Sequence, residues 1–573
     1  MPLFSDKSPM EYDAIVVGSG ISGGWAAKEL CEKGLKTLVL ERGRNVEHGK
    51  DYDTANLERW QLPNNGEMTA EQMKDYPKQK RTGYTIGNGH AKFFVKDTEH
   101  PYYEKPNTRF DWIRGYQVGG RSLVWGRQSY RWSPMDFESN AREGVAIPWP
   151  IGYDDVAPWY DYVERFAGIS GQKEGLRQLP DSLFLEPMAL NAVEKDLKEK
   201  IKNNYNDRML TIGRVAHITS NTDQFENRGS CQFRNRCMRG CPYGGYFSSN
   251  AATLPAAEKT GNLTLRPFSI GHQVMYDENK KSATGIQVID QLTKKTYEFK
   301  AKIIFLCAST VGSTSILMQS TSNRYPNGMG NDSGELGHNI MDHHFQVGAT
   351  AKVEGFDNRY YKGRRPNGYY IPRFRNLPWM PETKKDFLRG YQYQGGASRE
   401  GWSRSVAEMS YGGAYKDEMM TPGDWTVGMN AFGEILPYHD NEMVLNNDKK
   451  DKWGLPTVTF STTIRENEEK MRKDMKEAAV EIYEKAGYKD VQPYDRGYGI
   501  GLGIHEMGTA RMGNDPKTSV LNKHNQIHDC KNVFVTDGSC MTSAACQNPS
   551  LTYMALTARA ADYAVSELKK QNL

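Results

Sequence analysis

The stretch YDAIVVGSGISGGWAAKELCEKGLKTLVLE, residues 12–41, decides the fold of this chain. Its apolar, β-branched start at residues 12–17 predicts a buried parallel strand. Residues 24–33 place apolar side chains at helical spacing and end at Gly34, and residues 36–40 predict a second strand. Together these segments predict a β-α-β unit of about 30 residues.

Three glycines lie between the first strand and the helix, and Glu41 ends the second strand. In such a unit Gly18 allows the tight turn, Gly20 lets a pyrophosphate approach the backbone, and Gly23 lets helix and strand pack closely. Amides at the helix start would face the phosphates, and Glu41 can accept a hydrogen bond from a ribose hydroxyl. The pattern predicts a dinucleotide site and suits NAD and FAD equally. The alternative is a glycine-rich turn without a ligand.

The C-terminal end predicts a second part of the same fold. Residues 532–536 read as a strand, Asp537 and Gly538 follow, and residues 549–568 read as a helix with a proline in its first turn. A cofactor that is longer than a single nucleotide could contact residues from both ends of the chain.

The middle of the chain has a different pattern. Residues 302–308 predict another buried strand and residues 311–319 a helix. Alternating runs at 368–373 and 455–460 indicate an antiparallel sheet exposed on one face, and residues 466–486 predict an amphipathic helix.

Composition excludes several classes of protein. The 573 residues predict two or three large domains, and 74 Lys and Arg against 70 Asp and Glu leave a net charge of +4, too balanced for a nucleic-acid partner bound by a basic patch. No apolar stretch approaches the roughly 20 residues of a membrane span. The N-terminus shows no secretory signal, so we expect either a cytoplasmic protein or one exported by a partner. The 55 glycines suggest close backbone approaches, as around a cofactor.

Three of the eight cysteines lie close together in the segment RGSCQFRNRCMRGCPYGG. Cys231, Cys237 and Cys241 permit three interpretations. Zinc would require a fourth ligand, and a disulfide would leave an odd thiol. Clustered thiolates followed by Pro242 favour an iron–sulfur cluster, and three cysteines suit the [3Fe–4S] type.

Several separated blocks resemble the glucose–methanol–choline (GMC) flavoprotein oxidoreductases, over nearly the whole chain. They are the unit at 18–41, GYQVGGRS at 115–122, and the blocks at 505–513 and 537–550. The resemblance implies FAD and an α/β fold, with a Rossmann-like FAD-binding domain built from discontinuous segments and an antiparallel-sheet α+β substrate domain. We expect the FAD-binding domain at 1–45, 105–135, 255–345 and 500–573, the substrate domain at 346–499, and excursions at 46–104 and 136–254 that include the cysteine loop 229–245.

The family's FAD-contacting positions fall on specific residues of this chain. They are Gly18, Gly20, Gly23, Glu41, Gly119, Gly120, Ser122, Asp537, Gly538, Pro549 and Ser550. The helix that Pro549 and Ser550 open would direct its positive end at the flavin and stabilise the anionic reduced form.

The resemblance also implies a catalytic pair. His505 is the expected base, because a histidine pKa lies near neutrality, and Asn548 is its partner. Asn548 could instead be the N-cap of the following helix. His338, His343 and His344 are expected near the flavin and not at a metal, and residues 391–394 are candidates for shaping the substrate site.

The cysteine loop makes the chain resemble iron–sulfur-containing catalytic subunits of bacterial sugar dehydrogenases, glucoside 3-dehydrogenases in particular. This implies a sugar or glycoside substrate, with C3 of a glucoside favoured, and hydride transfer from a secondary hydroxyl to flavin N5. Electrons would then pass through the cluster to a cytochrome c-type acceptor. A small partner subunit would carry the enzyme to the periplasm, although a cytoplasmic location also fits. The alternatives are an oxidase that uses O2 and a catalytically silent flavoprotein that senses redox state.

Overall fold

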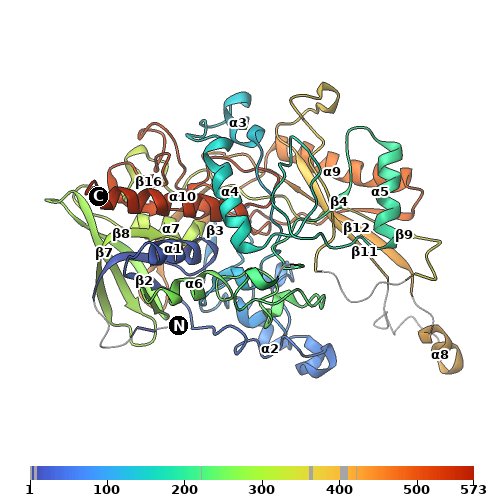
Figure 1. The fold of residues 1–573 in the computed structure, drawn as a ribbon, viewed down its shortest axis with the longest axis horizontal. Helices are drawn as coiled ribbons and strands as arrows, with labels where there is room; N and C mark the ends of the chain where they lie inside the picture. The colour runs from blue at the N-terminus through green and yellow to red at the C-terminus, as the bar shows by residue number, and fades with distance from the viewer. Residues whose placement is uncertain (1–2, 5–9, 221, 360–365, 400–410, 421–422) are drawn as a thin grey trace.

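The computed structural model describes residues 3–4, 10–220, 222–359, 366–399, 411–420 and 423–573. Two parts lie side by side (Figure 1): one is built on a mixed eight-stranded sheet and the other on an antiparallel six-stranded sheet. Within these residues, no helix combines the length and the apolar character needed to cross a bilayer.

The eight-stranded sheet contains the predicted β-α-β unit. Its order is β16-β17-β8-β1-β2-β5, with β7 joined to β8 and β6 to β7. The strands are β1 (Glu11–Val17), β2 (Thr37–Leu40), β5 (Leu263–Arg266), β6 (Ser269–Asp277), β7 (Ser282–Asp290), β8 (Thr296–Leu306), β16 (Gln526–Ile527) and β17 (Cys530–Val535). Val17 pairs in parallel register with Leu40 on one side and Leu306 on the other. The carboxyl ends of the central strands therefore meet at one edge, where α/β sheets bind their ligands.

Helices cover this sheet. They include α1 (Ile21–Glu32), α6 (Thr253–Lys259), α7 (Thr310–Gln319) and α10 (Ser550–Lys569). Small buried residues at Ala26, Ala27, Ala560 and Ala561 share one core cluster, which lets α1 and α10 approach closely. The predicted α/β fold class is confirmed, and the end of α10 that carries Ser550 points into the middle of the molecule (Figure 1).

The six-stranded sheet has the order β15-β9-β12-β11-β10-β4. Its strands are β4 (Thr211–Ile212), β9 (Val347–Val353), β10 (Tyr369–Ile371), β11 (Tyr391–Arg399), β12 (Trp425–Gly433) and β15 (Lys489–Asp495). The helices α5 (Ala192–Asn204) and α9 (Glu466–Lys485) share a core cluster with alternate residues of β11 and β12, such as Tyr393 and Met429. The intervening residues Gln394 and Asn430 line a cavity, so the second face of the sheet forms a wall of the candidate site.

A third, three-stranded sheet corrects one expectation. It joins β3 (Tyr103–Glu104), β13 (Glu442–Lys450) and β14 (Pro456–Ser461). The alternating run at 455–460 was expected in the same sheet as 368–373. It lies apart because β14 pairs in parallel with β3 from the first part of the chain. The remaining α-helices of the described residues are α2 (Ala70–Met73), α3 (Pro134–Glu143), α4 (Tyr153–Ala167) and α8 (Gly412–Met420).

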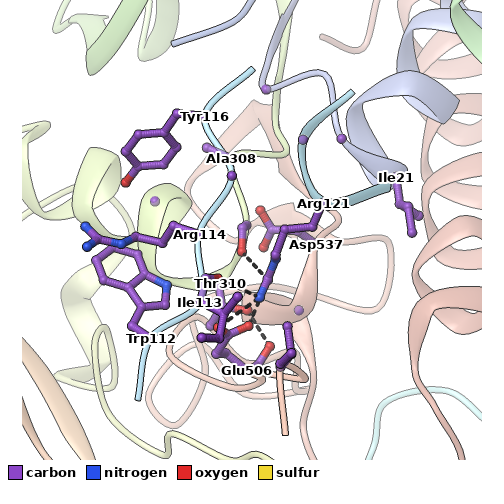
Figure 2. A pocket seen from close by; sticks show the side chains of 18 of the residues that line it. Ile21, Trp112, Ile113, Arg114, Tyr116, Arg121, Ala308, Thr310, Glu506 and Asp537 are labelled. Atoms are coloured by element: carbon purple, nitrogen blue, oxygen red, sulfur yellow. Dashed lines mark hydrogen bonds and ion pairs between the residues drawn. The ribbon is translucent and has the colours of Figure 1, made fainter. Parts of the chain in front are cut away.

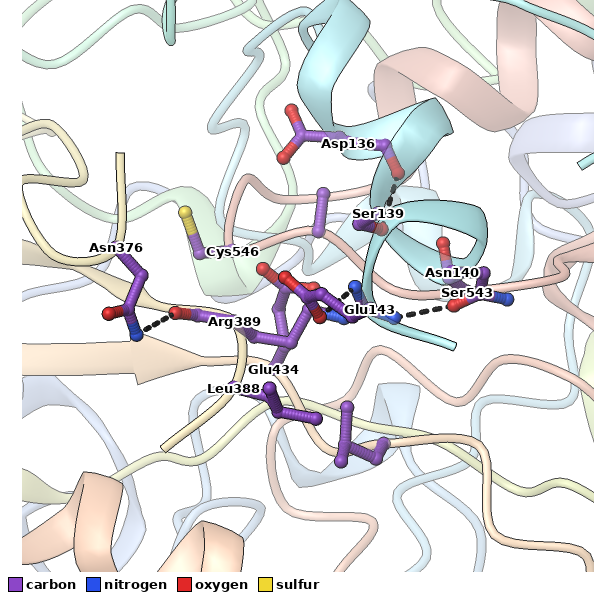
Figure 3. Close-up of polar contacts among 12 residues, drawn as sticks. Asp136, Ser139, Asn140, Glu143, Asn376, Leu388, Arg389, Glu434, Ser543 and Cys546 are labelled. Atoms are coloured by element: carbon purple, nitrogen blue, oxygen red, sulfur yellow. Dashed lines mark hydrogen bonds and ion pairs between the residues drawn. The ribbon is translucent and has the colours of Figure 1, made fainter. Parts of the chain in front are cut away.

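A buried charge network joins the two parts (Figure 3). Arg389 forms an ion pair with Glu143 of α3, lies 3.4 Å from one carboxyl oxygen of Glu434, and donates to the side chain of Asn140. Arg373 donates a hydrogen bond of 3.2 Å to the other oxygen of Glu434. Burial raises the pKa of Glu434 to about 8, although both guanidinium groups oppose this shift. The segment that carries Glu434 is therefore fixed to α3 by largely buried contacts.

Candidate active site

A cavity of about 520 Å³ opens at the carboxyl ends of β1, β2 and β8. Its volume lies in the range of about 300–1,000 Å³ typical of ligand and cofactor sites. The wall runs from Gly20 and Glu41 past Arg121 to His505 and Asn548. One continuous space therefore joins the glycine turn to the predicted catalytic pair.

The glycine turn leaves room for a cofactor at one of its three glycines. A Cβ on Gly18 would lie 2.4 Å from the carbonyl oxygen of Cys307, and one on Gly23 would lie 2.0 Å from the carbonyl oxygen of Gly18. A Cβ on Gly20 would meet nothing within 4 Å, and Gly20 lines the cavity. The turn thus combines two close backbone contacts with one open position, as pyrophosphate binding requires.

Glu41 lines the cavity and also holds the turn together. Its carboxylate accepts hydrogen bonds from the Ser19 hydroxyl at 2.5 Å, the Ser19 amide at 3.2 Å and the Gly43 amide at 2.9 Å. Burial raises the pKa of this carboxyl, and the hydrogen bonds from Gly43 and Ser19 oppose the shift.

The other expected FAD-contacting residues divide into two groups. Gly18, Gly20, Glu41, Gly120, Ser122, Asp537, Gly538 and Ser550 line the cavity, whereas Gly23, Gly119 and Pro549 lie behind its wall. The Gly119 amide donates to the Ser19 hydroxyl at 3.0 Å, and a Cβ there would lie 1.7 Å from the side-chain oxygen of Asn250. Gly119 therefore brings two loops together and does not face the cavity.

An ion pair that the sequence did not indicate stands in the middle of the cavity wall (Figure 2). Arg121 contacts both carboxylate oxygens of Glu506, at 3.0 and 2.8 Å. The guanidinium also donates to the Ile113 carbonyl and the Ser309 hydroxyl. Both partners belong to blocks singled out in the sequence, but only folding shows that they meet.

His505 and Asn548 meet at the far end of the cavity. The Asn548 side-chain nitrogen lies 3.3 Å from Nε2 of His505, and the Asn548 oxygen accepts a hydrogen bond of 2.6 Å from Gln394. The N-cap of α10 is Pro549, without a side-chain cap, so Asn548 turns toward His505 and not toward the helix. Burial, together with His343 and Arg121, lowers the pKa of His505 well below its usual value. A neutral imidazole, which can accept a proton, therefore faces the cavity.

The histidine run near residue 340 divides among three surroundings. His343 lies 2.8 Å from His505, ring nitrogen to ring nitrogen. His344 contacts Arg472, and His338 stacks on His439. Throughout the described ranges, no group of three or more His, Cys, Asp or Glu side chains is arranged to hold a metal ion.

Cys231, Cys237 and Cys241 line a separate small cavity as free thiols. Its volume of about 20 Å³ suits a single water molecule. The donor atoms have the chemistry of iron–sulfur ligands, each of which can bind a different iron, but the space is smaller than a cluster. Arg234, Arg236 and Arg239 of the same loop attach it to residues 55–58.

The fold and the cavity are those of a dinucleotide-binding protein, with His505 at one end of the cavity. The sequence profile of the GMC oxidoreductase family matches residues 12–345 and 437–557. Since the first match alone spans more than half of the chain, the protein belongs to the GMC oxidoreductase family. The resemblance found in the sequence is confirmed.

Individual proteins support this placement. The chain is 28% identical to the 2-methyl-1,2-propanediol dehydrogenase of Mycolicibacterium austroafricanum, over 96% of this chain and 95% of that protein. It is 25% identical to the fructose dehydrogenase large subunit of Gluconobacter japonicus, over 98% and 99%. Formate oxidase of Aspergillus oryzae RIB40 shares the fold with a TM-score of 0.60 and 13% identity, over 98% of this chain and 99% of that one.

The protein is accordingly an FAD-dependent oxidoreductase that acts on the CH–OH group of an alcohol or sugar. The expected enzyme class and the expected cofactor FAD are confirmed at this level. Sequence reasoning missed Arg121, Glu506 and the contact between His343 and His505. It placed Gln394 in a candidate substrate region without assigning it a role.

Proposed function

We propose that this enzyme oxidises a secondary hydroxyl of a sugar or glycoside, with C3 of a glucoside favoured and a 3-keto sugar as product. The observation that supports it best is the pairing of His505 with Asn548 in the same cavity as the open backbone at Gly20. The cavity wall also carries the side-chain amides of Gln128, Gln394 and Asn430, which suit a ligand with several hydroxyl groups. The name of the Gluconobacter relative supports the same substrate class.

His505, Asn548 and Gln394 have separate roles in the proposed reaction. His505 Nε2 accepts the hydroxyl proton, while the Asn548 amide orients the oxygen that loses it. Bound FAD supplies the acceptor for the carbinol hydrogen, which leaves with two electrons, so that the alcohol becomes a ketone. Gln394 holds the Asn548 amide in the orientation that this role requires.

The test of the catalytic pair is stopped-flow reduction of the flavin by glucosides and free sugars. Removing a general base typically costs about 10²–10⁴ in rate, so His505→Ala should lose reduction by that factor while it retains FAD. His528→Ala is the matched control, because that histidine contacts Ser519 and does not line the cavity. Unchanged reduction in His505→Ala would refute the assignment. Identification of the ketone position in the product decides between C3 and other carbons.

For electron exit we propose that Cys231, Cys237 and Cys241 hold an iron–sulfur cluster, expected as [3Fe–4S]. The support is that the three thiols line one small cavity, and that Cys241 opposes the lowering by burial of the pKa of the neighbouring Arg228. Phe233 and Tyr243 of the same loop are exposed, as a surface for a partner requires. We propose a small partner subunit and a cytochrome c-type acceptor, with export to the periplasm in that complex and a cytoplasmic location as the alternative. The Gluconobacter relative is itself named as a large subunit.

Iron and acid-labile sulfide in anaerobically purified protein are the first measurement, and their absence would refute the cluster. In Cys237→Ser, flavin reduction by sugar should persist while turnover with a one-electron acceptor falls. Cys31→Ser is the control, since Cys31 is a buried core thiol outside this cavity. Stoichiometric peroxide formation in air would favour the oxidase alternative. Flavin bleaching by sugar would exclude the silent redox sensor.

A further inference from the structure

His343 lies behind His505, outside the cavity wall and almost fully buried. Its two ring nitrogens have different partners. Nε2 is hydrogen-bonded to the backbone carbonyl of Ala545, and Nδ1 lies 2.8 Å from Nδ1 of His505. The rings stand nearly perpendicular, at 75°. Each nitrogen of His343 therefore has one defined partner.

The carbonyl of Ala545 determines where the proton of His343 lies. A carbonyl oxygen only accepts hydrogen bonds, so Nε2 of His343 must carry a proton. Burial lowers the pKa of His343 to about 4, so the ring is neutral near pH 7 and its Nδ1 carries a lone pair. A hydrogen bond of 2.8 Å between the two Nδ1 atoms then requires that Nδ1 of His505 is the donor.

We propose that His343 is a positioning residue that fixes the tautomer of His505, with the proton on Nδ1 and the lone pair of Nε2 directed into the cavity. This inference rests on the proposed role of His505 as the base. It goes beyond that role because it names the residue that decides which nitrogen can take the substrate proton.

The opposite side of His505 leads to the same tautomer. Gln394 donates to the oxygen of Asn548, which turns the NH2 group of Asn548 toward Nε2 of His505 at 3.3 Å. An NH2 group can only donate, so Nε2 must be an acceptor in the resting protein. The hydrogen bonds on both sides of His505 therefore require the same tautomer, with the proton on Nδ1 and the lone pair on Nε2. They form one series, Ala545–His343–His505–Asn548–Gln394.

The backbone around His343 holds the two rings in place. Asp342 accepts hydrogen bonds from the amides of Gly501, Gly503 and His505, at 2.7, 2.9 and 3.0 Å. The segment that carries His343 therefore also anchors the loop that carries His505. Ala545 lies three residues before Asn548, so one loop supplies both the carbonyl that His343 needs and the partner of the base.

The matched variants are His343→Asn and His343→Leu, which have side chains of similar size and shape. Asn can place a carbonyl oxygen near the position of Nδ1 and still accept from His505, whereas Leu cannot accept. A general base typically contributes roughly 10²–10⁴-fold to the rate. His343→Leu should therefore reduce the rate constant for flavin reduction at least about tenfold, and His343→Asn should keep most of the wild-type rate. Both variants should bind FAD, because the side chain at position 343 does not line the cavity.

The decisive readout is the ¹⁵N spectrum of the imidazole nitrogens in histidine-labelled holoprotein, with the His505 signals assigned by their loss in His505→Gln. Wild type and His343→Asn should show a protonated Nδ1 and a bare Nε2, and His343→Leu should show a mixture of tautomers. A wild-type His505 protonated at Nε2 in its neutral form would overturn the proposal, even if no variant folds.

Equal slowing in both variants with unchanged His505 signals would also overturn it, because His343 would then act only through packing. If His505→Ala reduces flavin at the wild-type rate, the proposed function fails instead. The two failures are thus distinguishable.

Discussion

Gly20 lines the cavity with its backbone, because glycine has no side chain. A Cβ there has open space, whereas one at Gly23 would collide with Gly18. Gly20 and Gly23, three residues apart in one turn, therefore have different roles. Gly23 is needed for close packing, and Gly20 lets the cofactor approach the backbone. A substitution at Gly20 should separate FAD binding from folding.

We expect Gly20→Val to fold but to lose FAD, because the added side chain fills the space that the pyrophosphate would take. The measurement is flavin released per protein on denaturation, with circular dichroism as the check on folding. Gly413→Val in α8 is the control, since a Cβ at that exposed position also meets nothing within 4 Å. A Gly20→Val protein with a full complement of flavin would contradict the assignment.

The lowered pKa of His505 has a kinetic consequence. Burial keeps the imidazole neutral, so protonation inactivates it only well below the ordinary histidine pKa of about 6.5. The rate constant for flavin reduction should therefore stay level from about pH 8 down to about pH 6.5 and fall only at lower pH. A midpoint near 6.5 in stopped-flow measurements would show that His505 is solvated or is not the base.

At the scale of elements, Arg389 and Glu434 join α3 to the segment that follows β12 of the six-stranded sheet (Figure 3). In the unfolded chain Glu434 ionises near pH 4.5, while in the folded protein it holds its proton to about pH 8. Between these values the native state binds more protons than the unfolded state, so this group lowers stability as the pH rises.

Glu434→Gln should remove this contribution. In the variant, the free energy of unfolding should fall less between about pH 5 and pH 8 than in the wild type, because an amide does not ionise. Urea unfolding at several pH values measures the slope. Glu477→Gln on the exposed side of α9 is the matched control and should follow the wild type. Parallel curves for Glu434→Gln and wild type would contradict the raised pKa.

Elements with a local pattern could be predicted from the sequence. The strand, turn and helix of residues 12–41 and the helix α10 each carry their period and their end signals within a few turns. The site contacts could not be predicted in this way. His343 meets a histidine 162 residues away and a carbonyl 202 residues away, and Gln394 meets Asn548 across 154 residues. Nothing in the local period of residues 340–345 indicates these contacts, because tertiary packing brings them about.

At the scale of the whole molecule, the cavity takes its wall from both parts. Gly20 belongs to the first strand-turn-helix unit, Gln394 and Asn430 to the six-stranded sheet, and His505 and Asn548 to the C-terminal blocks. A ligand that fills this space contacts all of them. FAD should therefore act on the stability of the entire protein and not of one part.

Adding FAD to apoprotein should raise the midpoint of thermal unfolding in a concentration-dependent way. Ligand at about 100 times its Kd stabilises the bound state by roughly 2.7 kcal/mol. Differential scanning calorimetry over a range of FAD concentrations measures the effect, and Gly20→Val should show none. A midpoint that does not move in the wild type would mean that FAD does not bind the folded apoprotein, and an equal rise in Gly20→Val would mean that this cavity is not the FAD site.

The order of strands in the eight-stranded sheet has a consequence for synthesis on the ribosome. β1 emerges among the first residues, yet β8, its neighbour, and β17, the neighbour of β8, follow hundreds of residues later. Such distant pairings make folding slow, since long loops must close first. The nucleotide turn is translated early, but its pocket cannot be completed until the segment from His505 to Ser550 has left the exit tunnel. Flavin loading would then require translation through Ser550, and a nascent chain cut short before Ser550 would stay colourless.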